Sequence, residues 1–535
     1  MTNLVTPSLR GTKQSRYKRL NLDCFAPLPM TKMSFPFFQR QGCRCYSLAM
    51  RSCLKFLLIL LTCPILAQNK TSGTTEYHIE TTGSAATGKF TPFWIVSNKY
   101  GTVPLQAGNA FLRTGISHHQ SLAKELHWSA GMDVIAVTPR YNNFYLQQLY
   151  AAIQYKSLNL TIGSHENYSS LWDKELSSGD MVHSPNARPI PEINISVPKF
   201  TAIPFTGKHL QFRGNTAFGR SFDSKYLQSL ANENEYYIKD VLWHHKSLQL
   251  RFLDPEKRFP FTAVIGMMHH AQWGGTSNNP EIGKEPRSFK DLLRIIFGKA
   301  GGEDSSITNR MNVLGNHYGS YELQFGYLGN GFDVHIYSQH FFDDVSGMEL
   351  YNFPDGLWGL QVDIPNFTWL NKIVVEYLDT RNQSGPFHWL WFDRDIYPGY
   401  GGGNDNYYNN IEYTTGVSYF NRGIGSPLLT SPEYNKNNAF GFKNNRVSAF
   451  HVGFQGYLSK QHLYHILVTS SENWGTMLSP FLKKKNNLSC AAKITYCHPR
   501  LEDWIFSGEV AADFGSLYGN TAGIIFSIKK TGILK

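Results

Sequence analysis

The chain has 535 residues, of which 41% are hydrophobic, 14% aromatic and only 17% charged. This composition excludes an intrinsically disordered protein, because the chain has ample apolar surface to bury. The formal net charge of +11 does not indicate a nucleic-acid partner, since residues 1–67 hold ten of the 51 Lys and Arg and one of the 40 Asp and Glu. The remaining 41 basic and 39 acidic residues nearly cancel.

Residues 50–67 have the features of a secretory signal peptide. A basic start precedes the apolar run from Phe56 to Leu61, and the small residue before Gln68 suits a cleavage site. The apolar run is too short to cross a bilayer as a helix. We interpret residues 1–49, which are basic and lack a period, as an N-terminal extension from an incorrect start codon; a cytoplasmic arm is the alternative. The exported chain is then predicted to comprise residues 68–535.

Short segments with an apolar residue at every second position follow along the exported chain. Such segments are typical of an outer-membrane barrel, whose apolar face meets lipid and whose polar face lines a lumen. A soluble sandwich or propeller also alternates, but the full charges on the polar faces and the lack of a propeller repeat favour the barrel. No run of 18 apolar residues occurs, so we expect no transmembrane helix. Clear examples are 158–162, 192–197, 209–218, 321–327 and 504–510.

Two cysteines, Cys490 and Cys497, lie after the predicted signal peptide. On one strand, the seven-residue separation corresponds to about 23 Å, which is far beyond the reach of a disulfide. We therefore expect two unpaired thiols.

Two short helices are predicted to interrupt the strands. At residues 91–100, Thr91-Pro92 provides an N-cap followed by a proline at the first helical position. At residues 288–298, Ser288 and Asp291 form a capping box before a single apolar stripe. An apolar stripe must be buried on something, and in a barrel protein we expect it to pack at the barrel mouth.

The sequence contains none of the motifs typical of hydrolases, zinc proteases or nucleotide-binding proteins. Adjacent histidines, as in His118-His119, His244-His245 and His269-His270, point to opposite faces of a strand and are poorly placed to share a metal. Asp393, Asp395, Asn404 and Asp405 surround a glycine-rich loop, but they form a weak calcium ligand set, and a solvated loop is the better interpretation. We predict no enzyme, no cofactor and no metal.

Several loops are rich in aromatic rings and hydrogen-bonding side chains, and the longest polar run is residues 163–198. Sugars bind to aromatic faces and to Arg, Asn, Asp or Ser, and Arg also clamps the carboxylates of acidic sugars. Alternatively, these groups bond to one another and plug the lumen, and for residues 163–198 we expect a plug first. The candidate carbohydrate-binding residues are Trp172, Arg188, Trp273, Arg381, Tyr407, Tyr408 and Arg422.

The same loops carry a family resemblance through the motifs SLWDKELSSGDMVHSPNARPIPEI, HHAQWGGTS, LGNHYGSYEL, YLDTRNQSGPFH, GGGNDNYYNN, GVSYFNRGIGSPL and GFKNNRV. From about Tyr77 to its end, the chain resembles the capsule assembly protein Wzi family in its Bacteroides-type branch. The resemblance implies a monomeric barrel of about eighteen antiparallel strands, with a small helical bundle at the periplasmic end. One departure is the ending IKKTGILK, which lacks the terminal aromatic residue common in such barrels.

We therefore predict an all-β protein, a transmembrane antiparallel β-barrel of about 18 strands with a few short periplasmic or plug helices, in the cell outer membrane. The resemblance implies a lectin-like function, in which the barrel binds capsular or other surface polysaccharide and helps assemble or retain it on the cell. The expected partners are this polysaccharide and outer-membrane lipids, without nucleic acid. An outer-membrane porin for sugars or oligosaccharides is the first alternative, and a hydrolase of glycan or lipid is the second.

Overall fold

The computed structural model describes residues 73–167, 170–233, 235–387 and 403–534. The predicted signal peptide and N-terminal extension lie outside these ranges, as do Asp393 and Asp395 of the candidate calcium loop. Within the described ranges, no helix has both the length and the apolar character needed to cross a membrane.

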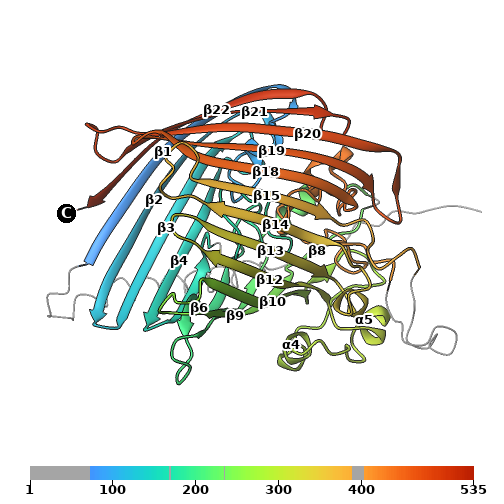
Figure 1. Ribbon diagram of the computed structural model, residues 1–535. Coiled ribbons are helices and arrows are strands. Elements are labelled where there is room, and N and C mark those ends of the chain that lie inside the picture. The colour runs from blue at the N-terminus through green and yellow to red at the C-terminus, as the bar shows by residue number, and fades with distance from the viewer. Residues whose placement is uncertain (1–72, 168–169, 234, 388–402, 535) are drawn as a thin grey trace, which may run out of the picture. The chain divides into compact units, whose positions relative to one another are not determined.

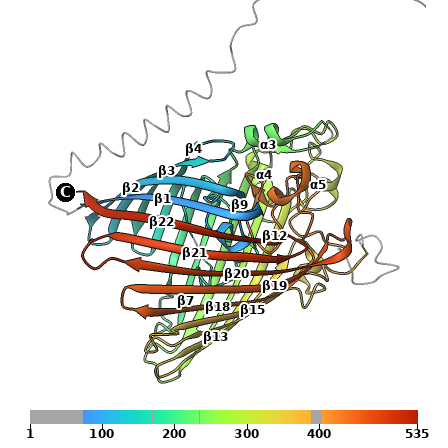
Figure 2. The same cartoon turned by 90° about the horizontal axis from the view of Figure 1, so that it is seen from above.

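Eighteen strands form one closed antiparallel sheet. They are β1 (Gly73–Phe90), β2 (Gln106–Ala123), β3 (Leu126–Thr138), β4 (Phe144–Tyr155), β5 (Leu158–Ser164), β6 (Glu192–Ala202), β7 (Leu210–Arg220), β9 (Leu242–Leu253), β10 (Phe261–Trp273), β12 (Asn316–Leu328), β13 (Asp333–Phe342), β14 (Gly356–Asp363), β15 (Lys372–Asp379), β18 (Val447–Ser459), β19 (His462–Gly475), β20 (Pro480–Cys497), β21 (Trp504–Gly515) and β22 (Thr521–Leu534). Each strand pairs with the next, and β22 closes the barrel on β1, from Thr75 opposite Leu534 to Ala86 opposite Gly523 (Figures 1 and 2). The predicted barrel of about eighteen strands is confirmed.

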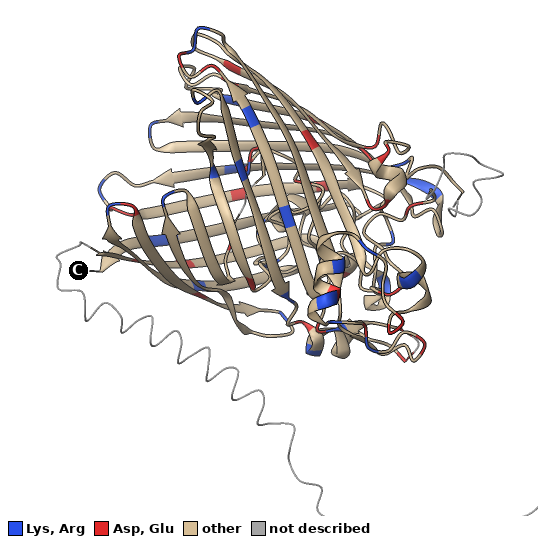
Figure 3. Ribbon diagram, turned by 90° about the horizontal axis from the view of Figure 1, so that it is seen from below, with Lys and Arg blue, Asp and Glu red and all other residues tan. Residues whose placement is uncertain are grey.

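Alternation along the strands separates an apolar outer surface from a polar lumen. On β2, Leu112 and Ile116 are exposed on the outside, whereas Arg113 points inward and pairs with Asp133 of β3. Most of the strand ribbon in Figure 3 is uncharged, and charged residues gather in the turns and loops. An apolar exterior of this kind suits contact with lipid.

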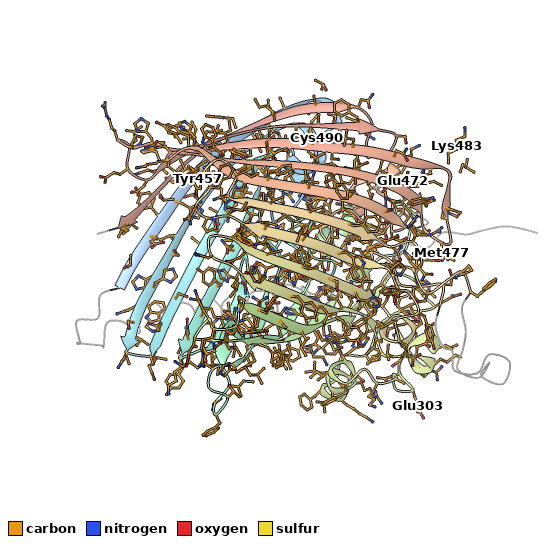
Figure 4. All side chains as sticks on the ribbon, viewed as in Figure 1. Glu303, Tyr457, Glu472, Met477, Lys483 and Cys490 are labelled. Atoms are coloured by element: carbon orange, nitrogen blue, oxygen red, sulfur yellow. The ribbon has the colours of Figure 1, made fainter. Side chains whose placement is uncertain are left out.

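The two ends of the barrel differ in the length of their connections. At one end, which we call the turn end, strands are joined by short turns such as residues 124–125 and 460–461, and β1 begins and β22 ends there. At the other, the loop end, the connections include residues 165–191 and 380–446. In Figure 4, Tyr457 lies toward the turn end, while Met477 and Lys483 lie toward the loop end. Because short turns face the periplasm in outer-membrane barrels, the loop end corresponds to the cell surface.

The short helices lie in the lumen or at the loop end, and the described residues form no helical bundle at the turn end (Figure 1). This corrects the periplasmic bundle that the resemblance implies. The physical reason is that the short turns leave too little chain for helices, whereas the long loops supply it. The elements are α2 (Phe93–Val96), α3 (Ser224–Leu230), α4 (Phe289–Ile296), α5 (Ile307–Met311), α6 (Val345–Met348), the 3-10 turns η3 (Pro432–Tyr434) and η4 (Lys436–Asn438), and the two-stranded sheets β8 (Ile238–Lys239) with β11 (Thr276–Ser277) and β16 (Ser418–Tyr419) with β17 (Arg422–Gly423).

The N-termini of α2 and α4 are capped in different ways. In α2, Pro92 is the N-cap, and the Thr91 hydroxyl donates to the Gln106 carbonyl at 2.7 Å instead of capping the helix. In α4, the expected capping box is present: the Ser288 hydroxyl accepts from the Asp291 N–H, and the Asp291 carboxylate accepts from the Ser288 N–H at 2.8 Å.

Residues 170–191 of the β5–β6 connection fold into the lumen and plug it. Glu376 of β15 accepts hydrogen bonds from the hydroxyls of Ser177 at 2.7 Å and Ser178 at 2.5 Å. His451 of β18 contacts the Leu176 carbonyl through Nε2 at 2.7 Å. The segment thus satisfies polar lumen groups that would otherwise be buried without partners, as expected for a plug.

Helix α2 fills a second part of the lumen from the β1–β2 connection. The Phe93 N–H donates to the Asp513 carboxylate of β21 at 2.8 Å, and the Trp94 ring N–H donates to the Thr469 hydroxyl of β19 at 3.2 Å. Its four residues are all buried. The barrel interior is therefore occupied by two segments, one anchored to β15 and β18 and the other to β19 and β21.

Candidate functional site

Trp172 lies deep in the plug. Its ring stacks on Tyr337 of β13, with ring centroids 4.5 Å apart and an interplanar angle of 21°. The side chain is buried, and its ring N–H has no hydrogen-bond partner among the described residues. Trp172 therefore packs the lumen and presents no free face to a sugar.

Tyr407 and Tyr408 are also structural. The Tyr407 hydroxyl donates to the Asp355 carboxylate at 3.0 Å and accepts from the Asn352 amide at 2.7 Å. The Tyr408 hydroxyl donates to the Met181 carbonyl in the plug and accepts from the Ser426 N–H. Both side chains are fully buried, so they tie the β15–β18 loop to its surroundings.

Trp273 and Arg381 lie apart from each other and from the plug core. Trp273 is buried in a cluster with Ile295 of α4, so its ring faces are covered. Arg381 is half exposed and pairs with Asp379, while its guanidinium lies over the Trp474 ring at 5.3 Å. Neither residue lines the cavity that Arg188 and Arg422 share.

Arg188 and Arg422 do meet, in a cavity of about 220 Å³ at the loop end that we call the arginine pocket. Although these two residues are far apart in sequence, the plug and the β15–β18 loop bring them together. The lining comes from five connections between strands and comprises Pro104, Leu105, Gln106, Arg140, Tyr141, Asn142, Tyr145, Arg188, Tyr226, Leu230, Phe420, Asn421, Arg422, Glu433 and Asn438.

Arg188 is held between two aromatic rings. Its guanidinium carbon lies 4.0 Å from the centroid of Tyr145 and 4.5 Å from that of Phe420. One terminal nitrogen donates to the Leu146 carbonyl at 2.7 Å, while Nε has no partner in the described part of the chain. Stacking on both sides fixes the guanidinium plane at little entropic cost.

Arg422 and Asn421 also line this cavity, and each has a buried polar atom without a hydrogen-bond partner among the described residues. Arg422 is 3% exposed and pairs with Glu433 through two hydrogen bonds of 2.7 and 3.1 Å. Its Nη1 donor and the Oδ1 acceptor of Asn421, which is 1% exposed, are buried without partners among the described residues. Because buried polar groups are almost always hydrogen-bonded, unpaired atoms in a cavity indicate a place for water or a ligand.

Two further groups set the electrostatics of the arginine pocket. Arg140 donates to the Tyr145 hydroxyl at 3.0 Å and the Gly101 carbonyl at 2.8 Å. Behind the lining, Asp223 accepts from the Phe420 N–H at 3.1 Å, and burial raises the pKa of Asp223 to about 6. The three arginines outnumber Glu433 and Asp223, so positive charge prevails in and around the arginine pocket.

A second polar cavity, of about 360 Å³, lies in the lumen beside α2. Two of its lysines are paired: Lys99 with Glu509 at 3.6 Å and Lys493 with Glu175 at 3.6 Å, whereas Lys174 lies over the Tyr100 ring at 5.1 Å. Arg113 similarly pairs with Glu166 at 2.9 Å. Both cavities combine aromatic rings with unpaired polar atoms, which is the combination that a sugar requires. The arginine pocket differs in its three arginines and in its place at the loop end.

The sequence profile of the family described as capsule assembly protein Wzi matches residues 67–430. The chain belongs to the capsule assembly protein Wzi family. Among solved structures, Wzi from Escherichia coli, described as an outer-membrane protein involved in group 1 capsule assembly and a carbohydrate-binding β-barrel, is similar with a TM-score of 0.54 and 11% identity over 84% of this chain and 83% of that one. OccK3 (OpdO) from Pseudomonas aeruginosa follows with a TM-score of 0.45 and 8% identity over 87% and 96%. No curated protein sequence matches significantly.

Sequence reasoning from the composition of the loops missed part of the arginine pocket. Arg140 and Tyr145 lie in or beside the short β3–β4 connection, and Tyr226 lies in α3 of the β7–β9 connection. Neither connection carries a motif, and only the three-dimensional fold brings these residues beside Arg188. The stretch Tyr419-Phe420-Asn421-Arg422 was recognisable as a polar, aromatic loop. Among the described residues, no group of three or more His, Cys, Asp or Glu is arranged to hold a metal ion.

Proposed function

We propose that this Wzi-family protein is an outer-membrane, lectin-like barrel that binds capsular or other surface polysaccharide and helps assemble or retain it on the cell. The observation that carries the proposal is the arginine pocket at the loop end, with its stacked rings and its unpaired Arg422 and Asn421 atoms. A cavity of about 220 Å³ is smaller than a typical drug site of about 300–1,000 Å³. It suits a single sugar residue of a chain.

The charge of the arginine pocket favours an acidic sugar. Arg140, Arg188 and Arg422 line it, and Glu433 is the carboxylate among the lining residues. A guanidinium can bind a carboxylate with two parallel hydrogen bonds. The Phe420 ring, which Arg188 covers from one side, can offer its other side to the C–H face of a sugar ring. A uronic acid or a similarly charged residue satisfies both requirements.

The proposed role is binding without catalysis and without a cofactor. Hydrolysis of a glycoside needs an acid and a second carboxylate on opposite sides of the bond, and Glu433 is instead engaged in two hydrogen bonds with Arg422. The arginine pocket thus resembles a recognition site in its chemistry. Turnover of a glycan or phospholipid panel by the purified protein would contradict this part of the proposal.

A porin is the rival function, and the filled lumen argues against it. Residues 170–191 and α2 occupy the interior and bond to Glu376, His451 and Asp513. In planar bilayers we expect the barrel to conduct almost no ions, whereas a porin gives a steady ionic current.

The test combines cells and purified protein. Deletion of the gene should release capsule into the medium, and complementation with the wild-type chain should restore its retention. Purified barrel in detergent micelles should bind the isolated capsular glycan, and Arg188→Ala should weaken the binding about tenfold or more, because stacked, desolvated arginines are common binding hot spots.

Arg381→Ala is the matched control, since Arg381 is outside the arginine pocket. Its binding should equal that of the wild type. Unchanged capsule retention on deletion, together with no glycan binding in vitro, would overturn the proposed function. An equal loss of glycan affinity in Arg188→Ala and Arg381→Ala would show that the binding site is not the arginine pocket.

A further inference from the structure

Helix α4 packs on the outside of the barrel near the loop end. Ala271 and Trp273 of β10 face outward, because Gln272 between them points into the lumen, where its amide donates to the Gly416 carbonyl at 3.1 Å. Ile295 of α4 and Leu314 form a buried cluster with these two outward-facing residues. The helix therefore covers the wall from outside (Figures 1 and 2).

The C-terminal end of α4 is fixed to the same wall by a hydrogen bond. Lys246 of β9 donates from Nζ to the Ile296 carbonyl, in the last turn of the helix. This contact satisfies a carbonyl that helices leave without an intrahelical partner, and it places a cation at the negative end of the helix dipole. One side of α4 thus packs against the barrel.

A second, exposed side of α4 is also apolar. Phe289 is 75% exposed, Leu293 41% and Phe297, immediately after the helix, 68%. Spaced by four residues, they follow one stripe along the helix, which lies next to the buried Ile295 side and is flanked by Lys290 and Arg294. Two large phenylalanines exposed so fully to water on one short helix are unfavourable, and so they indicate a covering medium.

The wall beneath α4 identifies that medium. Leu248 of β9, Ile265 of β10 and Leu323 of β12 are exposed and outward-facing on the three strands that α4 and its flanking residues approach. In a transmembrane barrel these side chains contact lipid. On β10, Met267 and His269 take the outward positions between Ile265 and Ala271, so α4 lies against the same wall at the border of this apolar surface.

We propose that α4 is an interfacial membrane anchor, whose Phe289–Leu293–Phe297 stripe inserts into the lipid leaflet at the loop end. Amphipathic helices that lie in the plane of a membrane have this design, with an apolar face toward the acyl chains and basic residues at its border. The anchor is separate from the arginine pocket and does not depend on the glycan-binding role. It fixes the height of the loop end above the bilayer on one side of the barrel.

Site-directed fluorescence tests this assignment in the barrel of residues 68–535, which lacks the five cysteines before residue 68. In a background with Cys490→Ser and Cys497→Ser, Leu293→Cys is labelled with an environment-sensitive dye in nanodiscs that hold one barrel each. We expect quenching by lipids that carry a spin label near the headgroup and protection from aqueous iodide. A label that iodide quenches fully, and lipid not at all, would overturn the proposal.

Two reference positions calibrate the measurement. For the first, the dye is attached to the native Cys490 in a Cys497→Ser variant. This position gives the quenching expected on the lipid-facing wall, because Cys490 shares its face of β20 with the exposed Leu488 and Ile494. Leu478→Cys, in the exposed β19–β20 turn at the loop end, reports water. The dye at position 293 should show lipid quenching and iodide quenching that are intermediate between those at the two reference positions.

A variant separates lipid contact from protein contact. Phe289→Glu with Phe297→Glu should expose the dye at position 293 to iodide while the barrel keeps its heat-modifiable migration on gels. If instead protection occurs only when several barrels share one bilayer patch, a second copy covers α4, and the lipid assignment is wrong.

Discussion

Asp223 makes the loop end sensitive to pH. Its carboxylate is buried, and it accepts from the Phe420 N–H in the wall of the arginine pocket. Burial raises the pKa of Asp223 from 3.8 to about 6, although backbone hydrogen bonds and Arg188 oppose the shift. Since the folded state binds this proton more tightly than the unfolded chain, the contribution of Asp223 is most favourable below pH 4 and is lost as the pH rises through 6.

We predict that Asp223→Asn removes this dependence. The amide keeps an oxygen that can accept from Phe420 but carries no charge, so the variant should be more stable than the wild type at pH 7.5, by up to about 3 kcal/mol. Calorimetric Tm values measured from pH 4 to 8 provide the check. Because other buried carboxyls titrate in the same range, the decisive quantity is the difference between variant and wild type, and a difference that stays constant across the range contradicts the prediction.

Tyr408 is predicted to matter for stability and not for glycan binding. Tyr408→Phe leaves the buried Ser426 N–H without its 2.9 Å acceptor, which costs about 1–3 kcal/mol. The expected result is a lower Tm with unchanged affinity for the capsular glycan. Tyr155→Phe, on an exposed tyrosine at the turn end, should change neither quantity. A selective loss of affinity in Tyr408→Phe would return this residue to the binding site.

At the residue level, the sequence predicted chemistry better than position. Arg188 and Arg422 were identifiable because they interrupt aromatic, polar loops, and they do share a cavity. Trp172, Tyr407 and Tyr408 have the same composition around them, yet they do not line this cavity. Composition cannot distinguish a ring that offers its face to a ligand from one that fills a lumen, because both need hydrogen-bonding neighbours.

At the level of elements, the plug depends on Glu376 of β15. This carboxylate accepts from the Ser177 hydroxyl, the Ser178 hydroxyl and the Ser178 N–H at 2.5–2.7 Å, and from the Tyr337 hydroxyl at 2.6 Å. We predict that Glu376→Ala loosens residues 170–191 and produces frequent channel openings in planar bilayers. Wild-type barrels should remain nearly closed.

The control for this measurement is Glu472→Ala, which removes an exposed carboxylate paired with Lys484 on the outer face of β19 and β20. Its conductance should match that of the wild type, because exposed pairs contribute little to structure. If Glu376→Ala also stays closed, other contacts of the plug, such as the Leu176 carbonyl with His451, are sufficient to hold it.

Strand prediction succeeded where alternation was regular and weakened where it was not. Residues 144–155 alternate poorly, and the structure explains why: Asp133 of β3 lies opposite Gln148, whereas Val134 lies opposite Leu146, so Gln147 is an extra residue in β4. A bulge of this kind turns two successive side chains to one face. Gln147 and Gln148 both donate inside the barrel, to Glu166 and Asp133 respectively.

For the whole molecule, periodicity indicates that strands exist but cannot say that they close or how many there are. Closure depends on the pairing of β1 with β22, residues that are separated by nearly the full chain, and local pattern contains no information about such a contact. The strand number came from the family resemblance. The family resemblance did not predict the position of the helices. That position depends on which end of the barrel has connections long enough to form helices.

The match to the Wzi family profile ends at residue 430, but the barrel needs the strands that follow. A chain that stops at residue 446 lacks β18 to β22 and leaves β1 and β15 with unpaired edges, which lipid cannot satisfy. It also loses Asp513 and Thr469, which anchor α2. We predict that this chain neither inserts nor shows heat-modifiable migration, whereas a chain that begins at Met50 inserts as the wild type does. Membrane fractionation with gels of heated and unheated samples compares the two, and insertion of the shortened barrel would mean that closure does not require β18 to β22.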